Sequence, residues 1–298
     1  MVRTLYRGLR ISAFELAQTT TALAIGVWGS LTVSQGHPRA VLAAGLFCAL
    51  CGLLCYLVSF SFLERHGHND RNFYSYATFA LALVLVASGL LLSQTTRTLA
   101  WGLLAAGLVL IGGQSGRMML KLHAGIYAVL STISSGIAAV AAGYFLRPAA
   151  QAEAGSSPAM VIAAAGAATG YALLVRSRKP TSYTGIYGVA SILLASAALL
   201  SLAGWGAVLM ARVLAAAPKA AAFHAAAMTA VLAGVIGCAA LGFRRWSRAE
   251  LKWLAWLTTL ALTYKVLFQD LAQAHGFSAV LSLAIYGTLL IWLPRQVR

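Results

Sequence analysis

Long, continuous runs of apolar residues separated by short polar segments make up most of this chain. About 20 helical residues, at 1.5 Å each, cross the roughly 30 Å of hydrocarbon in a bilayer. The runs do not alternate between apolar and polar residues, so they predict helices rather than strands of a barrel. Ten spans are predicted, at about 11–33, 40–63, 73–93, 98–115, 122–146, 158–175, 184–208, 219–243, 251–271 and 276–294.

The predicted fold class is therefore all-α, a polytopic transmembrane helical bundle. Its fourth and sixth apolar runs are short and rich in glycine, which leaves eight or nine spans as alternatives to ten. Hydrophobic residues make up 60% of the chain and charged residues only 9%, against about 25% charged in a typical soluble domain. No polar segment remains that could fold in water, so we expect residues 1–298 to form a single transmembrane domain.

Basic residues predict the orientation of the bundle, because Lys and Arg resist translocation. With ten spans, 16 Lys and Arg fall in the amino terminus, the carboxyl terminus and the loops on their side, and 5 fall in the opposite loops. The last one, Lys265, lies inside a span. This asymmetry predicts that both termini are cytoplasmic and that the protein is a multi-pass protein of the inner membrane.

The net charge of +16 also bears on partners. Basic residues occur as short clusters in loops between apolar runs, such as Arg117 and Lys121, with His123 beside them, and Arg244, Arg245, Arg248 and Lys252. Anionic lipid at the cytoplasmic face is the usual partner of such clusters. No basic patch is interleaved with aromatic residues on a soluble element, so nucleic acid is not an expected partner.

A faint internal repeat is visible at an offset of 60 residues. Residues 121–139 align without gaps with residues 181–199, and the alignment pairs Gly125-Ile126-Tyr127 with Gly185-Ile186-Tyr187. Two-helix units near 40–93, 98–146, 158–208 and 219–271 are one interpretation, and internal symmetry of this kind occurs in transporters. Chance and the anchoring of Tyr at the membrane interface are the other interpretation.

Motifs of known catalytic chemistry are missing from the sequence, which indicates a protein that is not an enzyme and needs no cofactor. There is no phosphate-binding loop, no His-Glu-x-x-His and no pair of acids spaced to hold a metal. Cys48, Cys51 and Cys55 share one helical face, but no His or acidic residue accompanies them. We expect them to serve packing rather than metal binding.

Ionisable residues inside spans are costly and are the default candidates for function. By depth, His224, Lys265 and Asp270 fall near the outer ends of adjacent antiparallel helices, and Gln269 and Tyr264 accompany them. They are predicted to line a polar pocket or solute pathway. The alternative is that Lys265 extends outward to the interface and the others lie at that interface. Glu15, near the cytoplasmic end of the first span, is a further candidate.

Two resemblances bear on the class of protein. The carboxyl-terminal hairpin, from Thr263-Tyr264-Lys265-Val266 to Trp292-Leu293-Pro294-Arg295, resembles an uncharacterised family of bacterial multi-spanning membrane proteins. Chain length, span count and Trp28-Gly29-Ser30 in the first span are similar to the drug/metabolite transporter superfamily. These resemblances imply a membrane location and, for the second, transport.

Two functions are therefore predicted. The first is a carrier or permease-like protein for a small solute, which the repeats, the glycine-rich helices and the outer polar residues favour. The second is a non-catalytic structural or assembly subunit that binds partner membrane subunits.

Overall fold

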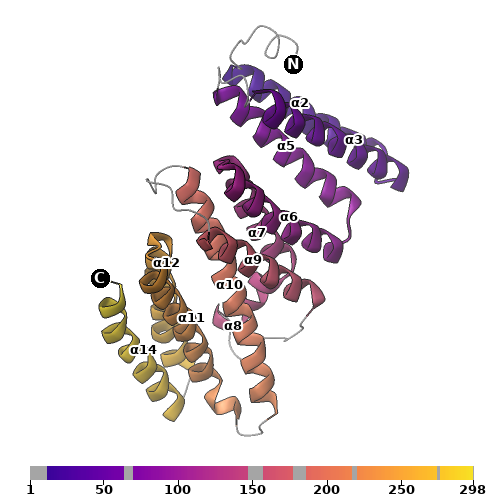
Figure 1. The fold of residues 1–298 in the computed structure, drawn as a ribbon. Coiled ribbons are helices and arrows are strands. Elements are labelled where there is room, and N and C mark those ends of the chain that lie inside the picture. The colour runs from indigo at the N-terminus through magenta and orange to yellow at the C-terminus, as the bar shows by residue number, and fades with distance from the viewer. Residues whose placement is uncertain are drawn as a thin grey trace. The chain divides into compact units, whose positions relative to one another are not determined.

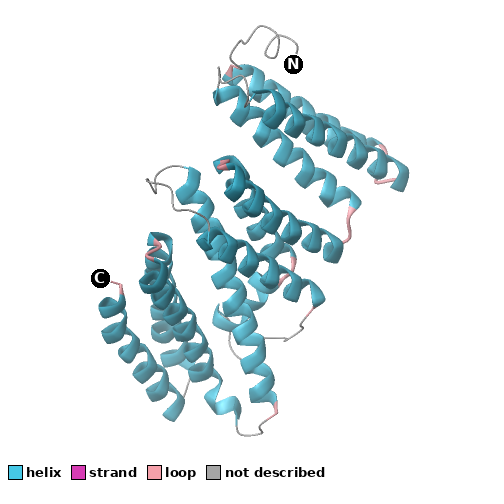
Figure 2. Ribbon diagram, viewed as in Figure 1, coloured by secondary structure: helices cyan, strands magenta, loops and turns pink. Residues whose placement is uncertain are grey.

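Every regular element in the part of the chain that the computed structural model describes is helical (Figure 2). The described residues are 12–63, 70–146, 157–176, 186–216, 220–273 and 276–297. Among them, 7 helices are long and apolar enough to cross a membrane, and a bent pair of helices makes a possible total of 8. The all-α prediction is confirmed, and the length and apolar composition of these helices indicate a multi-pass membrane protein. All ten predicted spans coincide with helices.

Contacts divide the chain into two compact units, Met1–Ser93 and Gln94–Arg298. Unit 1 consists of α2 (Ala13–Val33), α3 (Pro38–Leu57), the π-helical η1 (Val58–Leu63) and α5 (Asp70–Leu91). Within it α3 packs along α5. Cys48 and Cys55 are buried in this packing, against Tyr76 and Leu83. The cysteines thus fill space between two apolar helices.

Unit 2 contains the remaining helices. They are α6 (Gln94–Ser115), α7 (Met118–Ser134), α8 (Ile137–Leu146), α9 (Pro158–Arg176), α10 (Ile186–Ala215), the 3₁₀ turn η3 (Ala220–Phe223), α11 (His224–Trp246), α12 (Ala249–Lys265), the π-helical η4 (Val266–Asp270), α13 (Leu271–Gln273) and α14 (Phe277–Gln296). Its largest apolar core joins α8, α10, α11, α12 and α14. In Figure 1, α14 runs beside α11, and the two helices are in contact.

The two hairpins of the predicted repeats, α6–α7 and α9–α10, pack on each other. Helix α6 contacts α9 and helix α7 contacts α10, so corresponding helices of the two hairpins meet. At the first contact the backbones are very close, because a Cβ on Gly166 would lie 2.9 Å from the Gly102 Cα. Gly185 of the second copy of the motif lies outside the described residues.

The predicted span at 122–146 is not one straight helix, which corrects the sequence interpretation. Helices α7 and α8 are bent by 63° at Ser135 and Gly136. Gly136 has φ +84°, a left-handed conformation that is costly for residues with a Cβ. Sharp kinks are typical of such Ser-Gly pairs. The Ser135 hydroxyl accepts a hydrogen bond from the Ile137 backbone N–H at 3.3 Å and so caps the start of α8.

Side chains from α6 support this break. Gln94 Nε2 donates to the Ser134 carbonyl at 2.7 Å, and that carbonyl belongs to the last residue of α7. The Ser131 hydroxyl donates to the Thr98 carbonyl at 3.1 Å. Carbonyls at the end of a helix have no partner within it, so the Gln94 contact stabilises the interruption.

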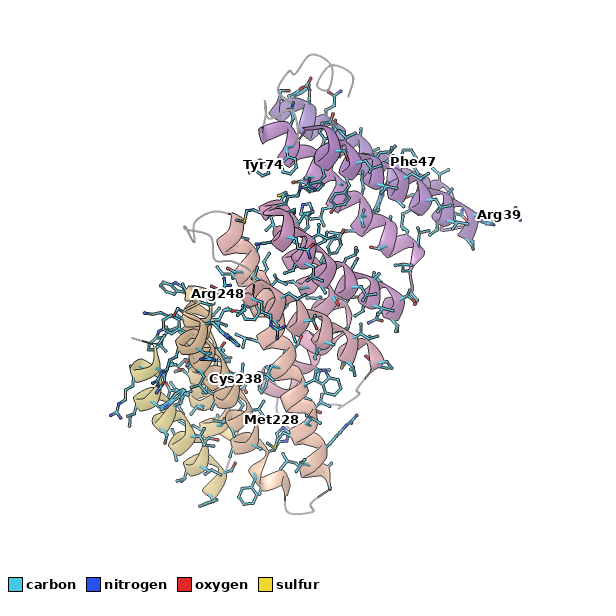
Figure 3. All side chains as sticks on the ribbon, viewed as in Figure 1. Arg39, Phe47, Tyr74, Met228, Cys238 and Arg248 are labelled. Atoms are coloured by element: carbon cyan, nitrogen blue, oxygen red, sulfur yellow. The ribbon has the colours of Figure 1, made fainter. Side chains whose placement is uncertain are left out.

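Large apolar side chains cover the outside of the helices. Phe47 of α3, labelled in Figure 3, is 57% exposed, and Ile291 of α14 is 65% exposed. A soluble monomer rarely exposes continuous apolar surface of this kind, whereas a surface that faces lipid requires it.

Candidate functional site

A buried ion pair lies near one end of unit 2, where α12 passes into η4. Lys265 Nζ is 2.5 Å from Asp270 Oδ1, and both side chains are 3% exposed. The Thr229 hydroxyl donates to Asp270 Oδ2 at 2.6 Å and accepts from Lys265 Nζ at 3.0 Å. Figure 3 labels Met228, the neighbour of Thr229 in α11. These three residues, called the ion-pair cluster below, join α11 to η4.

The π-helical winding of η4 makes this ion pair possible. Lys265 and Asp270 are five residues apart, and at about 100° per residue an α-helix would point them roughly 140° away from each other. In η4 the backbone N–H of Leu271 instead bonds to the Val266 carbonyl, five residues earlier. This looser winding brings residues five apart back to the same side of the helix.

The ion-pair cluster satisfies its own hydrogen-bonding groups. An ammonium group has three donors, and Lys265 Nζ has three oxygen acceptors, on Asp270, on Thr229 and on the Ala225 carbonyl at 3.2 Å. Both carboxylate oxygens of Asp270 accept hydrogen bonds. The net charge of the ion-pair cluster is zero, and burial in a low-dielectric interior is strongly unfavourable for an uncompensated charge.

Two further polar groups lie beside the cluster. The His224 ring, at the start of α11, is 6.2 Å from the Tyr144 ring of α8 between centroids. His224 interacts electrostatically with Lys265 and Asp270, and Tyr144 with Arg212 of α10. His224 Nε2 and the Tyr144 hydroxyl are buried and have no hydrogen-bond partner among the described residues. Buried polar atoms are nearly always bonded, so this pair indicates a place for water or a ligand.

Helix α14 brings two more hydroxyls to this depth. Ser278 and Ser282 are one turn apart and buried, and their hydroxyls likewise have no hydrogen-bond partner within the described parts of the chain. A 2.9 Å hydrogen bond between the hydroxyls of Thr263 and Tyr286 aligns α12 with α14. The two helices run antiparallel. Ser282 and Ser278 lie four and eight residues before Tyr286 in α14, and η4 lies a similar number of residues after Thr263. Both serines are therefore level with η4, which α14 contacts.

Several of the sequence-predicted residues thus lie together, and others do not. Lys265 is bonded to Asp270 and does not extend outward, so the alternative that placed it at the interface is wrong. Gln269 is half-buried in η4. Tyr264 is 51% exposed and stacks on Phe268 at 5.1 Å, so its predicted place in the polar pocket is also wrong.

Glu15 has a local structural partner. It is the third helical residue of α2, where its carboxylate accepts from the Ser12 backbone N–H at 2.8 Å, and the Ser12 hydroxyl accepts from the Glu15 N–H at 3.1 Å. This reciprocal arrangement is a capping box, which Ser-x-x-Glu at 12–15 could have indicated. Glu15 is exposed and belongs to unit 1, whereas the ion-pair cluster belongs to unit 2.

Thr229 and Tyr144 are members of the site that the sequence did not predict. Thr229 is one of many hydroxyl residues in the spans, and nothing in its neighbourhood separates it from the others. Tyr144 reaches His224 only because α8 is bent away from the direction of α7. The Ser-Ser-Gly at 134–136 is the one signal that could have found it.

A second group of buried polar residues lies near the other end of α11, where Figure 3 labels Arg248. Arg248 is 0% exposed and donates through Nη2 to the carbonyls of Leu174 and Val175, both at 3.0 Å. The Tyr171 hydroxyl donates to Glu250 Oε1 at 3.4 Å. Arg248 does lie in the predicted loop, between α11 and α12, but the expectation that its side chain binds lipid there is wrong, because the side chain is buried. It holds the last turn of α9 against the start of α12.

Lys121 and His123 require a similar correction. The sequence interpretation placed both in a basic cytoplasmic loop. The structure places them in α7, which begins at Met118, and they are 3% and 0% exposed. The loop is short because Gly116, at φ +71°, and Arg117 complete the turn from α6. Both side chains have interaction partners.

Three apolar grooves are also present. One of about 530 Å³ lies between α2 and α5 of unit 1, one of about 510 Å³ is lined by α9 to α12, and one of about 500 Å³ lies between α11 and α14. None of the three is lined by a residue of the ion-pair cluster. Within the described residues, no group of three or more His, Cys, Asp and Glu side chains could hold a metal ion.

Comparison of the chain with protein-family models, with curated proteins and with solved structures found no match. Fold and site together indicate a multi-pass membrane protein with a buried ion pair in one helical unit.

Proposed function

We propose that the protein is a carrier that moves a small polar solute across the cytoplasmic membrane. The observation that carries this proposal is the ion-pair cluster, with unpartnered His224 Nε2 and Tyr144 hydroxyl beside it, among helices that are otherwise apolar. Ionisable residues inside membrane-spanning helices are rare and mark the pathways of solutes, ions and protons.

Stability alone does not account for the ion-pair cluster. Replacing a buried ion pair by apolar residues of similar volume is often neutral or stabilising, so packing does not require these charges. The unpartnered groups on α8, α11 and α14 add to that cost. Binding a solute is a function that compensates for both.

Helix interruptions support the same conclusion. Carriers commonly bind solutes and coupling ions where membrane helices are interrupted. Tyr144 follows the break between α7 and α8, and Asp270 ends the π-helical η4. Two interrupted helices therefore supply residues to one polar site.

A structural or assembly subunit is the second candidate. It is favoured by the closed hydrogen bonding of the ion-pair cluster, which needs no further partner to be stable. In that case the exposed apolar faces would contact partner membrane subunits.

The placement in the membrane is also proposed, with ten spans, both termini in the cytoplasm and anionic lipid at the basic loops. The distribution of exposed and buried side chains on the segment from α12 to α13 supports the proposal that this segment crosses the membrane. Trp253, Leu260 and Phe268 are 71%, 66% and 65% exposed on its outside, whereas Lys265 and Asp270 face the interior of unit 2. This inside-out distribution suits a helix surrounded by lipid.

Reporter fusions test this placement. Fusions after residues 119, 178 and 247 are expected to report the cytoplasm, and fusions after 96, 151 and 216 the opposite side, because the basic residues gather on one side. A fusion pair around one helix that reports the same side would remove that span and reject ten crossings.

Uptake into vesicles tests the carrier proposal. Purified protein in lipid vesicles is expected to take up at least one of glucose, glycine, lactate, choline and uridine faster than protein-free vesicles. These labelled probes cover neutral, zwitterionic, anionic and cationic solutes. The control variant is Lys252→Met, which removes a positive charge from α12, the helix of Lys265, but outside the site. This variant should keep the uptake activity. No uptake of any probe would reject the carrier in favour of the subunit.

A further inference from the structure

We propose that the solute is a small monocarboxylate and that it enters the site together with one proton, which binds to Asp270. This inference rests on the proposed carrier function and adds the charge of the solute and the coupling ion. It follows from the geometry of the ion-pair cluster and from the groups that surround it.

The charge balance of the ion-pair cluster limits what can bind. The cluster is neutral and buried, and an uncompensated charge in such a place is strongly unfavourable. A solute that separates Lys265 from Asp270 must therefore leave the site neutral. Among singly charged solutes, an anion can bind to Lys265 if Asp270 gains a proton, and a cation can bind to Asp270 if Lys265 loses one, whereas a solute without net charge would bind with no change in protons.

The neighbouring groups favour the anion. Tyr144 interacts electrostatically with the exposed Arg212 of α10, so the charged group beyond the cluster on this side is positive. The buried Tyr144 hydroxyl is a hydrogen-bond donor without a partner among the described residues. The amino terminus of α11, at His224, also contributes partial positive charge. A freed ammonium and an unpartnered hydroxyl are both donors, of the kind that the two oxygens of a carboxylate accept.

The binding step conserves atoms and charge. A proton from the aqueous buffer binds to Asp270 Oδ1, and the hydrogen bond from Lys265 Nζ to that oxygen breaks. Lys265 stays protonated and donates instead to a carboxylate oxygen of the solute. The added charges, +1 from the proton and −1 from the solute, cancel. Thr229 can keep its bond to Asp270 Oδ2 throughout.

The titratable groups around Asp270 are few. Lys265 belongs to α12 and His224 to α11, with Tyr144 of α8 and Arg212 of α10 beyond His224. Helix α14 has no charged residue between Phe277 and Pro294. His224 Nε2, which is buried and has no hydrogen-bond partner among the described residues, is a second group here that can accept a proton.

Proton uptake on binding tests this proposal directly. Sodium benzoate or sodium lactate is added to the full-length protein in nanodiscs, in weak buffer at neutral pH with an indicator dye, and bound probe is counted separately. About one proton should be taken up per bound carboxylate. Choline chloride and glucose should cause no proton uptake, and Lys252→Met should behave as wild type.

Variants separate the two roles in the site. Asp270→Asn keeps the shape and is expected to bind benzoate with no proton uptake. Lys265→Met should weaken benzoate binding at least about tenfold, since it removes the charge-assisted hydrogen bond. Carboxylate binding without proton uptake, proton release on choline binding, or no carboxylate binding would each overturn the proposal. Vesicle uptake of glucose, glycine, uridine or choline alone would reject the monocarboxylate and leave the carrier standing.

Discussion

Asp270→Leu is expected to lower the free energy of unfolding by about 3–5 kcal/mol, because it leaves the Lys265 ammonium buried without its counter-ion. The double variant Lys265→Met/Asp270→Leu removes both charges and should recover most of this loss. Lys265→Met alone should be milder than Asp270→Leu, since Asp270 can become neutral by binding a proton. Reversible unfolding in mixed detergent micelles measures all three.

Lys252→Met is the matched control for these variants. It removes the same charge from the same helix, but Lys252 is half-buried, 5.8 Å from the centre of the Phe243 ring. Its free energy of unfolding should stay close to that of the wild type. A double variant as unstable as Asp270→Leu would show that the loss comes from packing and not from an unpaired charge.

The second large effect is expected at the crossing of α6 and α9, where Gly166→Ala should destabilise the protein by about 1–3 kcal/mol or more. Its Cβ would lie 2.9 Å from the Gly102 Cα and 3.3 Å from the Gly102 carbonyl oxygen. Both neighbours are backbone, so the two helices must move apart. Close approach of small residues is a main source of helix association in lipid.

Gly102→Ala, at the same crossing, gives the sharpest control. The nearest atom to its Cβ would be the Ile162 carbonyl oxygen at 3.7 Å, an ordinary contact. This variant should therefore be tolerated although it adds the same methyl group to the same interface. Equal destabilisation by both substitutions would contradict the asymmetric crossing.

The sequence predicted the helices well because the property that defines a membrane span is local. A run of about 20 apolar residues is visible without knowledge of its neighbours. The bend between α7 and α8 was missed because Gly136 lies in a run that is apolar on both sides. The last turn of α7 is held by Gln94 of α6, and the pattern of apolar residues along the chain contains no information on this contact between two helices.

The candidate site was predicted in part, for related reasons. The sequence predicted that His224, Lys265 and Asp270 lie at a similar depth, because this prediction requires only the rise per residue of a helix. Their direction could not be predicted, because α-helical geometry points Lys265 and Asp270 apart and only the π-helical η4 reunites them. Burial of Arg248 depends on carbonyls at the end of α9, far away in sequence, so the sequence could not show that this loop residue is buried.

The five-residue spacing of the ion pair also matters during biosynthesis. A charged residue opposes the insertion of a membrane helix, by about 2.5–3.5 kcal/mol at the middle of the helix, and Lys265 and Asp270 lie nearer to its end. Lys265 and Asp270 belong to one continuous helical segment, so they can neutralise each other before any other helix is in place. The segment can then enter the bilayer as a neutral helix. Thr229 belongs to α11, which is synthesised earlier, so its hydroxyl can bond to both side chains as soon as the segment packs against α11.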